Sequence, residues 1–230
     1  LTGVQVELTG DDFTFAGADG FRLAVYKGKL LEPISEDLTF IIPARSLQEV
    51  SRVLAGSSET VEFTVTPSKS QALFKLENIE IVTQLIQGTF PNYSQLIPES
   101  FDTRAVVNLG EFLGATRTAS IFARDGAGIV RLHVTAGTDD APGKLSIVSM
   151  AEEVGQNHGD IDAKVEGGEA KVEDDEAKIA FNSKYLADVL AVLQQDEVAL
   201  ETTTPSSPGV LRPVGSASYV HVVMPMFVQW

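Results

Sequence analysis

The feature that most constrains the fold is a repeated order of expected elements. Three segments carry the apolar spacing of an amphipathic helix, and each follows one expected strand and precedes three more. The helices are expected at 44–55, 109–121 and 183–195. Residues 4–26 read as three further strands without the strand and helix that would precede them. The chain is therefore predicted to contain three complete β-α-β-β-β units and one incomplete unit.

Capping residues mark where the expected helices begin and end. Asn108 precedes the second helix with Glu111 three residues later, which is the capping-box pattern, and Asn182 precedes the third. Pro43 and Gly56 bracket the first helix. Each helix is apolar on one face only, so each should lie on a sheet with its other face in solvent. The sequence thus predicts an α+β fold of antiparallel sheets with helices on one side.

Two units per domain give two domains. The predicted boundary lies in "IPESFDTR" at 97–104, which divides the chain into domains at 1–100 and 101–230. The chain opens directly on an expected strand, without an initiator methionine, and we interpret it as a fragment whose beginning is missing. The acidic stretch at 166–177 is expected to be a solvated loop.

Composition and charge exclude several classes of protein. A hydrophobic content of 43% supplies packed cores, and no apolar run approaches the roughly 20 residues of a spanning helix. The chain has no cysteine, which excludes disulfides and thiol catalysis and fits a reducing cytoplasm. A net charge of −15 disfavours binding to polyanions by overall attraction. Any role on nucleic acid would need local basic groups or a different way of holding it.

Catalytic and metal-binding patterns are absent from the sequence. The three histidines, His133, His158 and His221, have no metal-ligand spacing, and no nucleophile elbow or phosphate-binding loop occurs. The run "EDDE" at 173–176 could attract a divalent cation, but charge runs of this kind are usually solvated. The sequence predicts neither an enzyme nor a bound cofactor or metal.

Four collinear motifs carry a resemblance to a known family. "GADGFRLAVY", "GTFPNYSQLIP", "FNSKYLADVL" and "YVHVVMPM" together resemble the bacterial DNA polymerase III beta subunits, the replication sliding clamps, across their middle and C-terminal thirds. The resemblance implies a cytoplasmic, non-catalytic processivity factor. Two full-length subunits of that family close into a six-domain homodimeric ring around duplex DNA. The polymerase, the clamp loader and repair proteins dock on it through short peptides, typically a Gln followed by a Leu-Phe-like pair.

The resemblance places a peptide-binding groove between the two domains. Its expected residues are Leu1, Ala18, Gly20, Phe21, Arg22, Leu23, Pro91, Gln95, Leu96, Asn182, Tyr185, Val210, Val222, Met224, Pro225 and Met226. A concave apolar slot with a few fixed polar groups suits aromatic and aliphatic anchors, and methionines adapt to partners of different shape. Pro225 is expected to end the strand ladder and free the tail from pairing. The alternative is that "VHVVMPM" is an ordinary core strand.

The chain departs from the family pattern at two places near this groove. Phe227 to Trp230 replace the usual Arg-Leu ending, and Gln95 stands where a basic residue is common. These differences imply an altered rim and leave partner preference open.

The resemblance also implies positions that face DNA and a neighbouring subunit. Arg45 and Arg52 fall about 160° and 140° round their helix from Leu47, on the side away from its apolar stripe. With Lys184 and Arg117 they are candidates for loose phosphate contacts, or simply a solvated face.

Ile121 and Phe122, at the end of the second helix, are candidates for the subunit interface or for burial under the following strand. For the function as a whole, the alternative is a secreted β-rich module that binds carbohydrate or protein. A hydrolase is a third possibility that the sequence supports less.

Overall fold

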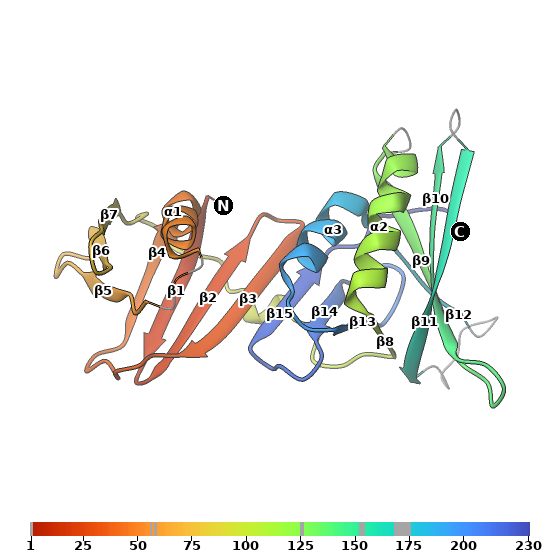
Figure 1. Cartoon of the computed structure of the whole chain (residues 1–230), viewed down its shortest axis with the longest axis horizontal. Helices are drawn as coiled ribbons and strands as arrows, with labels where there is room; N and C mark the ends of the chain where they lie inside the picture. Colours follow the sequence, from red (N-terminus) through yellow and green to blue (C-terminus); the bar gives the residue numbers. More distant parts are fainter. Residues whose placement is uncertain (1, 56, 58, 125–126, 152–154, 168–175) are drawn as a thin grey trace. The chain divides into compact units, whose positions relative to one another are not determined.

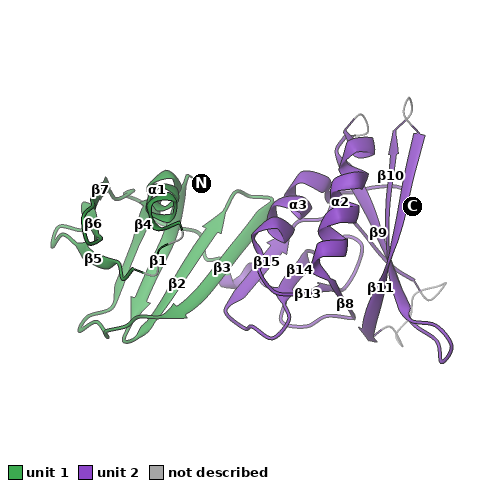
Figure 2. Cartoon of the chain, viewed as in Figure 1, with its two compact units in different colours: residues 1–93 green, residues 94–230 purple. Residues whose placement is uncertain are grey.

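The structure is a computed structural model, and it describes residues 2–55, 57, 59–124, 127–151, 155–167 and 176–230. The chain divides into two compact units, unit 1 at Leu1–Tyr93 and unit 2 at Ser94–Trp230 (Figure 2). Each unit is described by itself below.

Unit 1 begins with an antiparallel meander. Strands β1 (Gly3–Thr9), β2 (Asp12–Ala18) and β3 (Arg22–Lys29) pair in sequence, and β4 (Leu38–Pro43) pairs with the other edge of β1 (Figure 1). The register sets Val6 opposite both Phe15 and Phe40. Alternating apolar residues therefore share one face of this sheet, which is the core face.

A single helix and a smaller sheet complete unit 1. Helix α1 (Ala44–Leu54) follows β4 directly, and β5 (Glu62–Val65), β6 (Gln71–Lys75) and β7 (Glu80–Gln84) form a three-stranded antiparallel sheet. An isolated bridge between Ile41 and Ile86 joins the chain just after β7 to β4. The core contains Val6, Leu8, Phe40, Ile42, Val50, Ala72, Phe74 and Leu85.

Unit 2 contains two complete repeats. The first is β8 (Thr103–Asn108), α2 (Leu109–Ala123), β9 (Ile129–Thr135), β10 (Gly143–Ala151) and β11 (Gly155–Gly167). The second is β12 (Glu176–Asn182), α3 (Ser183–Val192), β13 (Glu197–Thr202), β14 (Gly209–Pro213) and β15 (Tyr219–Val223). A short 3₁₀ helix, Ser94–Leu96, precedes them.

The two repeats of unit 2 exchange their first strands. The strand order is β12-β9-β10-β11-β8-β13-β14-β15, so the strand before each helix pairs with the strand after the other helix. Phe181 of β12 lies opposite Val130 of β9, and Val107 of β8 lies opposite Val198 of β13. Helices α2 and α3 pack against each other over the sheets (Figure 1). Their apolar faces close one core that includes the fully buried Phe112.

The predicted fold class is confirmed. All strand pairs described above are antiparallel, and β-α-β-β-β occurs three times in chain order after an opening meander. The third helix ends at Val192 instead of 195, because Leu193 already has an extended backbone. No helix in the described part of the chain is long and apolar enough to cross a membrane.

The prediction of a loop across 166–177 is wrong at both ends. Residues 166 and 167 belong to β11, and 176 and 177 belong to β12. Residues 168–175 between them, including most of the "EDDE" run, lie outside the described residues.

Candidate functional site

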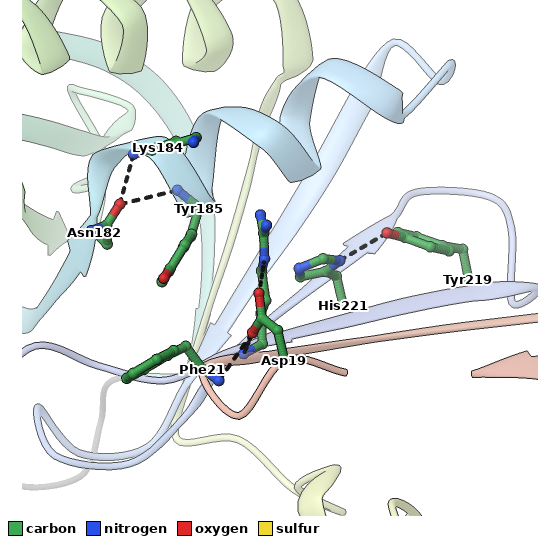
Figure 3. A network of polar contacts seen from close by, with 8 residues as sticks. Asp19, Phe21, Asn182, Lys184, Tyr185, Tyr219 and His221 are labelled. Atoms are coloured by element: carbon green, nitrogen blue, oxygen red, sulfur yellow. Dashed lines mark hydrogen bonds and ion pairs between the residues drawn. The ribbon is translucent and has the colours of Figure 1, made fainter. Parts of the chain in front are cut away.

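In unit 1 the residues expected to form the groove lie on the turn between β2 and β3. Gly20 has a φ of +88°, a left-handed conformation that glycine adopts without the steric cost of a side chain. The Asp19 carboxylate accepts hydrogen bonds from the backbone N–H groups of Phe21 and Arg22, both at 3.1 Å (Figure 3). The Phe21 side chain is 57% exposed and Leu23 is buried. The turn therefore presents one aromatic ring at its tip and anchors the next strand in the core.

Asp19 also holds the Arg22 side chain. The Arg22 guanidinium donates through Nε to Asp19 Oδ2 at 2.8 Å. Partial burial acts to raise the pKa of Asp19, but the hydrogen bonds from Arg22 and from the backbone N–H of Phe21 outweigh it and lower the pKa. The charged carboxylate thus holds the Arg22 side chain in place. The sequence analysis named Arg22 as a groove residue but did not identify Asp19 as its partner.

In unit 2, Asn182 caps helix α3 as predicted. Its side-chain oxygen accepts hydrogen bonds from the backbone N–H groups of Lys184 at 3.0 Å and Tyr185 at 3.3 Å (Figure 3). These bonds satisfy two of the N–H groups that every helix start leaves unpaired. Tyr185 is half-buried and packs against the core of unit 2. The cap therefore fixes where the tyrosine side chain leaves the helix.

The expected apolar wall is formed by the last two strands. Val210 of β14 and Val222 of β15 lie directly opposite each other, and both are buried. β15 ends at Val223, and Met224 is 42% exposed while Pro225 is buried. The two valines thus fit the core-strand alternative, whereas Met224 offers an exposed flexible side chain.

The strand ladder ends before Pro225 and residues 224–230 form no strand, but the tail keeps one backbone hydrogen bond to another strand. The backbone N–H of Met226 donates to the carbonyl oxygen of Ala180 at 2.7 Å, so the tail joins β12. Further along, the Trp230 ring meets the His133 ring edge-on with centroids 5.4 Å apart. His133 lies opposite Lys178 on β12, which means that the tail runs antiparallel to β12, away from α3. The proline thus follows the end of one ladder, and a single backbone hydrogen bond then ties the tail to β12.

The remaining expected groove residues are surface positions. Pro91 is exposed in unit 1, and Gln95 and Leu96 are exposed on the 3₁₀ helix that opens unit 2. Ala18 ends β2 and is half-buried. Leu1 lies outside the described residues. All described members of the predicted set thus fall on the β2–β3 turn, residues 91–96, the start of α3 or the β14–β15 wall and tail.

Three polar residues near these positions were missed by the sequence analysis. Asp19 holds the β2–β3 turn, and the hydroxyl oxygen of Tyr219 lies 2.8 Å from Nδ1 of the buried His221 on β15 (Figure 3). An aspartate directly before a turn glycine is a signal for Asp19. The i, i+2 spacing on one strand face is a signal for Tyr219 and His221.

The four cationic candidates for DNA contact are exposed on the helices. Arg45 and Arg52 lie on α1, Arg117 on α2 and Lys184 on α3. Arg52 forms an ion pair with Glu49 at 2.6 Å, which reduces its availability for a phosphate.

The two interface candidates on α2 differ in exposure. Ile121 is 64% exposed and Phe122 is half-buried. The burial alternative therefore fails for Ile121.

Two observations on the described residues concern metal binding and hydrolytic chemistry. No set of three or more metal-ligating side chains gathers among them. Ser146 and His158 both bind the same oxygen of Asp160, at 2.5 Å and 2.8 Å. In a hydrolytic triad the histidine lies between the hydroxyl and the carboxylate, but here the carboxylate lies between the other two. His158 therefore cannot accept the Ser146 proton in this arrangement.

Paired β-α-β-β-β repeats with exchanged strands define the clamp class of fold, and known structures share it. A DNA polymerase sliding clamp from Bacillus subtilis superposes with a TM-score of 0.87 at 30% identity, over 99% of this chain and 57% of that one. The DNA polymerase III beta chain of Streptococcus pneumoniae superposes with a TM-score of 0.85 at 28% identity, over 99% of this chain and 57% of that one.

Both halves of the chain match the same family. Residues 1–92 match the central domain of the DNA polymerase III beta subunit and residues 94–227 match its C-terminal domain. The chain belongs to this family, and the resemblance seen in the sequence is confirmed. The beta sliding clamp of Staphylococcus aureus is 32% identical over 227 residues, which cover 98% of this chain and 56% of that protein. The chain therefore spans about half the length of the curated relatives it matches.

Proposed function

We propose that this chain works as part of a sliding clamp that encircles duplex DNA and tethers a polymerase to it. Family membership across both halves is the observation that carries the proposal. In this proposal the segments 1–100 and 101–230 act as the middle and C-terminal clamp domains. The part played is non-catalytic, because a tether acts by holding two molecules together, and its place is the cytoplasm.

Partner proteins dock through short peptides in this proposal. The receiving residues are those on the β2–β3 turn, residues 91–96, the start of α3 and the tail. The exposure of Phe21 and of Met224 is consistent with this, since the apolar side chains of a docking surface must be accessible to the partner. The adaptable thioethers of Met224 and Met226 suit peptides from the polymerase, the clamp loader and repair proteins alike.

DNA is held by topology rather than by affinity. A net charge of −15 opposes tight binding, and loose contacts from Arg45, Arg117 and Lys184, with a smaller part for the ion-paired Arg52, permit sliding. A closed ring requires a longer polypeptide than these 230 residues, assembled as a homodimer through contacts that include Ile121 and Phe122.

Calorimetric titration with a Gln-x-x-Leu-Phe peptide tests the docking surface. We expect saturable binding to the chain, lost when the Leu and Phe of the peptide are both replaced by alanine. Met224→Asp should weaken binding strongly because it places a charge on the apolar contact. Met150→Asp is the matched control, since Met150 is a similarly exposed methionine on β10.

Absence of binding by the unaltered chain would refute the docking proposal, and so would equal weakening by both substitutions. The fluorescence of Trp230 is a poorer reporter than calorimetry, because the tail carries this residue along β12 and away from α3.

A further inference from the structure

The tail, residues 224–230, forms no strand but is tied to the sheet of unit 2 at two points. The first is the hydrogen bond that the Met226 N–H donates to the carbonyl oxygen of Ala180 at 2.7 Å. The second is the edge-on contact between the Trp230 and His133 rings, whose centroids lie 5.4 Å apart. A segment outside regular structure keeps one position only where contacts of this kind hold it. These two ties therefore set where the tail lies.

His133 is itself held in place on the side of β9 that faces away from the core. The residues directly before and after it are buried in the core, so alternation along the strand turns His133 outward. Nδ1 of His133 donates to Oε1 of Glu176 at 3.0 Å, since a carboxylate can only accept. The other oxygen of Glu176 lies 3.2 Å from Nζ of Lys178. The imidazole that Trp230 meets is thus oriented by a carboxylate of β12 that has a second partner.

The first tie lies beside the start of α3. Ala180 is two residues before Asn182, which caps the helix and fixes where Tyr185 leaves it. The bond to Ala180 therefore holds Met226 next to the backbone that leads into the proposed docking residues of α3. Met224 is fixed from the other side, because it directly follows β15. The position of both methionines thus depends on how the tail is held.

Neither tie is strong by itself. A single hydrogen bond shifts a conformational equilibrium by about two- to twelvefold net, and a contact between two rings by a similar factor. The Trp230 side chain is also 47% exposed, so water competes for its place. The two ties therefore support each other, and loss of the ring contact should raise the fraction of time for which the Met226 bond is open.

We infer that Trp230 is a positioning residue for the docking surface: its ring, latched on His133, keeps Met226 where a partner peptide meets it. The inference rests on the proposed function and adds to it a contact outside the docking residues of α3. Trp230 acts through the backbone of the tail, because the tail carries its ring along β12 and away from α3.

Two measurements on the whole chain test this latch. Hydrogen exchange of the Met226 amide, resolved by NMR, reports how often the tail opens. Calorimetric titration with the Gln-x-x-Leu-Phe peptide reports the affinity. The variants are Trp230→Ala, His133→Ala and the two combined, with Trp230→Phe as the conservative replacement.

His158→Ala is the matched control. His158 is also a histidine beside a carboxylate, with Nε2 2.8 Å from Oδ1 of Asp160, but it is exposed on β11. Its replacement should leave both Met226 exchange and peptide affinity unchanged.

We expect Trp230→Ala to speed exchange of the Met226 amide about two- to twelvefold, the factor that corresponds to one ring contact. Peptide affinity should fall by about twofold or more, but by no more than the factor found in exchange, because each opened tail removes one binding-competent molecule. His133→Ala should have the same two effects, and the double variant should lose no more than either single variant. Trp230→Phe should restore most of both, and the amides of the β9–β12 ladder should exchange unchanged in Trp230→Ala.

Unchanged exchange of the Met226 amide in Trp230→Ala would overturn the latch. Faster exchange with unchanged affinity would overturn its role in docking, and so would losses that add in the double variant. Lack of peptide binding by the unaltered chain would refute the proposed function and the role in docking with it. The exchange measurement would then still decide whether the ring pair holds the tail, so the two failures can be told apart.

Discussion

The cap of α3 provides a test of how local structure supports the proposed peptide site. Asn182→Ala removes the acceptor of two backbone N–H groups, those of Lys184 and Tyr185, in a half-buried setting. Loss of an N-cap typically costs about 1 kcal/mol of folding free energy, within a range of about 0.5–2. Asn182→Ala leaves two N–H donors unsatisfied where water has limited access. We therefore expect a loss of folding free energy in the upper part of this range, about 1.5 kcal/mol.

The other repeat of unit 2 supplies a matched control. Asn108 caps α2 at the same position, but it accepts a single bond, from the N–H of Glu111 at 3.0 Å, and is exposed. Water can replace that bond, so Asn108→Ala should cost about 0.5–1 kcal/mol. For a unit of this size each kcal/mol lowers the melting temperature by about 3–4 °C. Thermal unfolding followed by circular dichroism measures both variants.

Peptide affinity separates a structural effect from an effect on the site. Asn182→Ala should weaken binding of the Gln-x-x-Leu-Phe peptide, since Tyr185 leaves the helix directly after the cap. Asn108→Ala should leave binding unchanged, and Asn182→Asp, which keeps an acceptor oxygen, should restore most of the stability. Equal loss of affinity in the two alanine variants, or an unchanged melting temperature for Asn182→Ala, would refute the reasoning.

Three further predictions concern single residues. Burial, together with the charge of Glu7 and a hydrogen bond to it, raises the pKa of Tyr93 to about 12. The stabilisation, about 1 kcal/mol after allowance for solvent exposure, is complete below pH 10 and is lost as the pH rises towards 12. In urea unfolding experiments, the Tyr93→Phe variant should therefore lack this loss of unfolding free energy between pH 10 and 12. Asp19→Asn should destabilise unit 1 by less than about 1 kcal/mol at neutral pH. Because the pKa of Asp19 is lowered in the folded protein, the difference in unfolding free energy between Asp19→Asn and the unaltered chain should disappear as the pH falls below 3.8. A gap that persists at lower pH would contradict the role of its charge. Phe112→Ala, at a fully buried position, should cost about 3–5 kcal/mol in chemical denaturation, and a loss below about 1 would contradict the packing described for α2.

Much of the fold could be predicted because it depends on local patterns. Period-two alternation gave the strands, the 3.6-residue period gave the three helices, and Asn108 and Asn182 marked two helix starts that the structure confirms. Helix ends were harder to predict. Nothing in the local sequence shows that α3 stops at Val192, because the extended backbone at Leu193 serves the path into β13.

The candidate site depends more strongly on long-range pairing. Sequence motifs selected Pro225 as the end of a ladder, but they could not show that the Met226 N–H donates a hydrogen bond to Ala180, which lies 46 positions earlier in the chain. The partner of Arg22 was missed for a different reason, since the Asp19 carboxylate becomes its partner only when Gly20 turns the chain back.

The sequence by itself determined the repeated order of elements, the α+β class and the family, because periodicity, capping and collinear motifs are properties of neighbouring residues. The tertiary structure alone decided which strands exchange between repeats and which strand holds the tail. The physical reason is that burial and strand pairing are set by segments distant in the chain, and a linear pattern does not specify which of several compatible edges and apolar faces will meet.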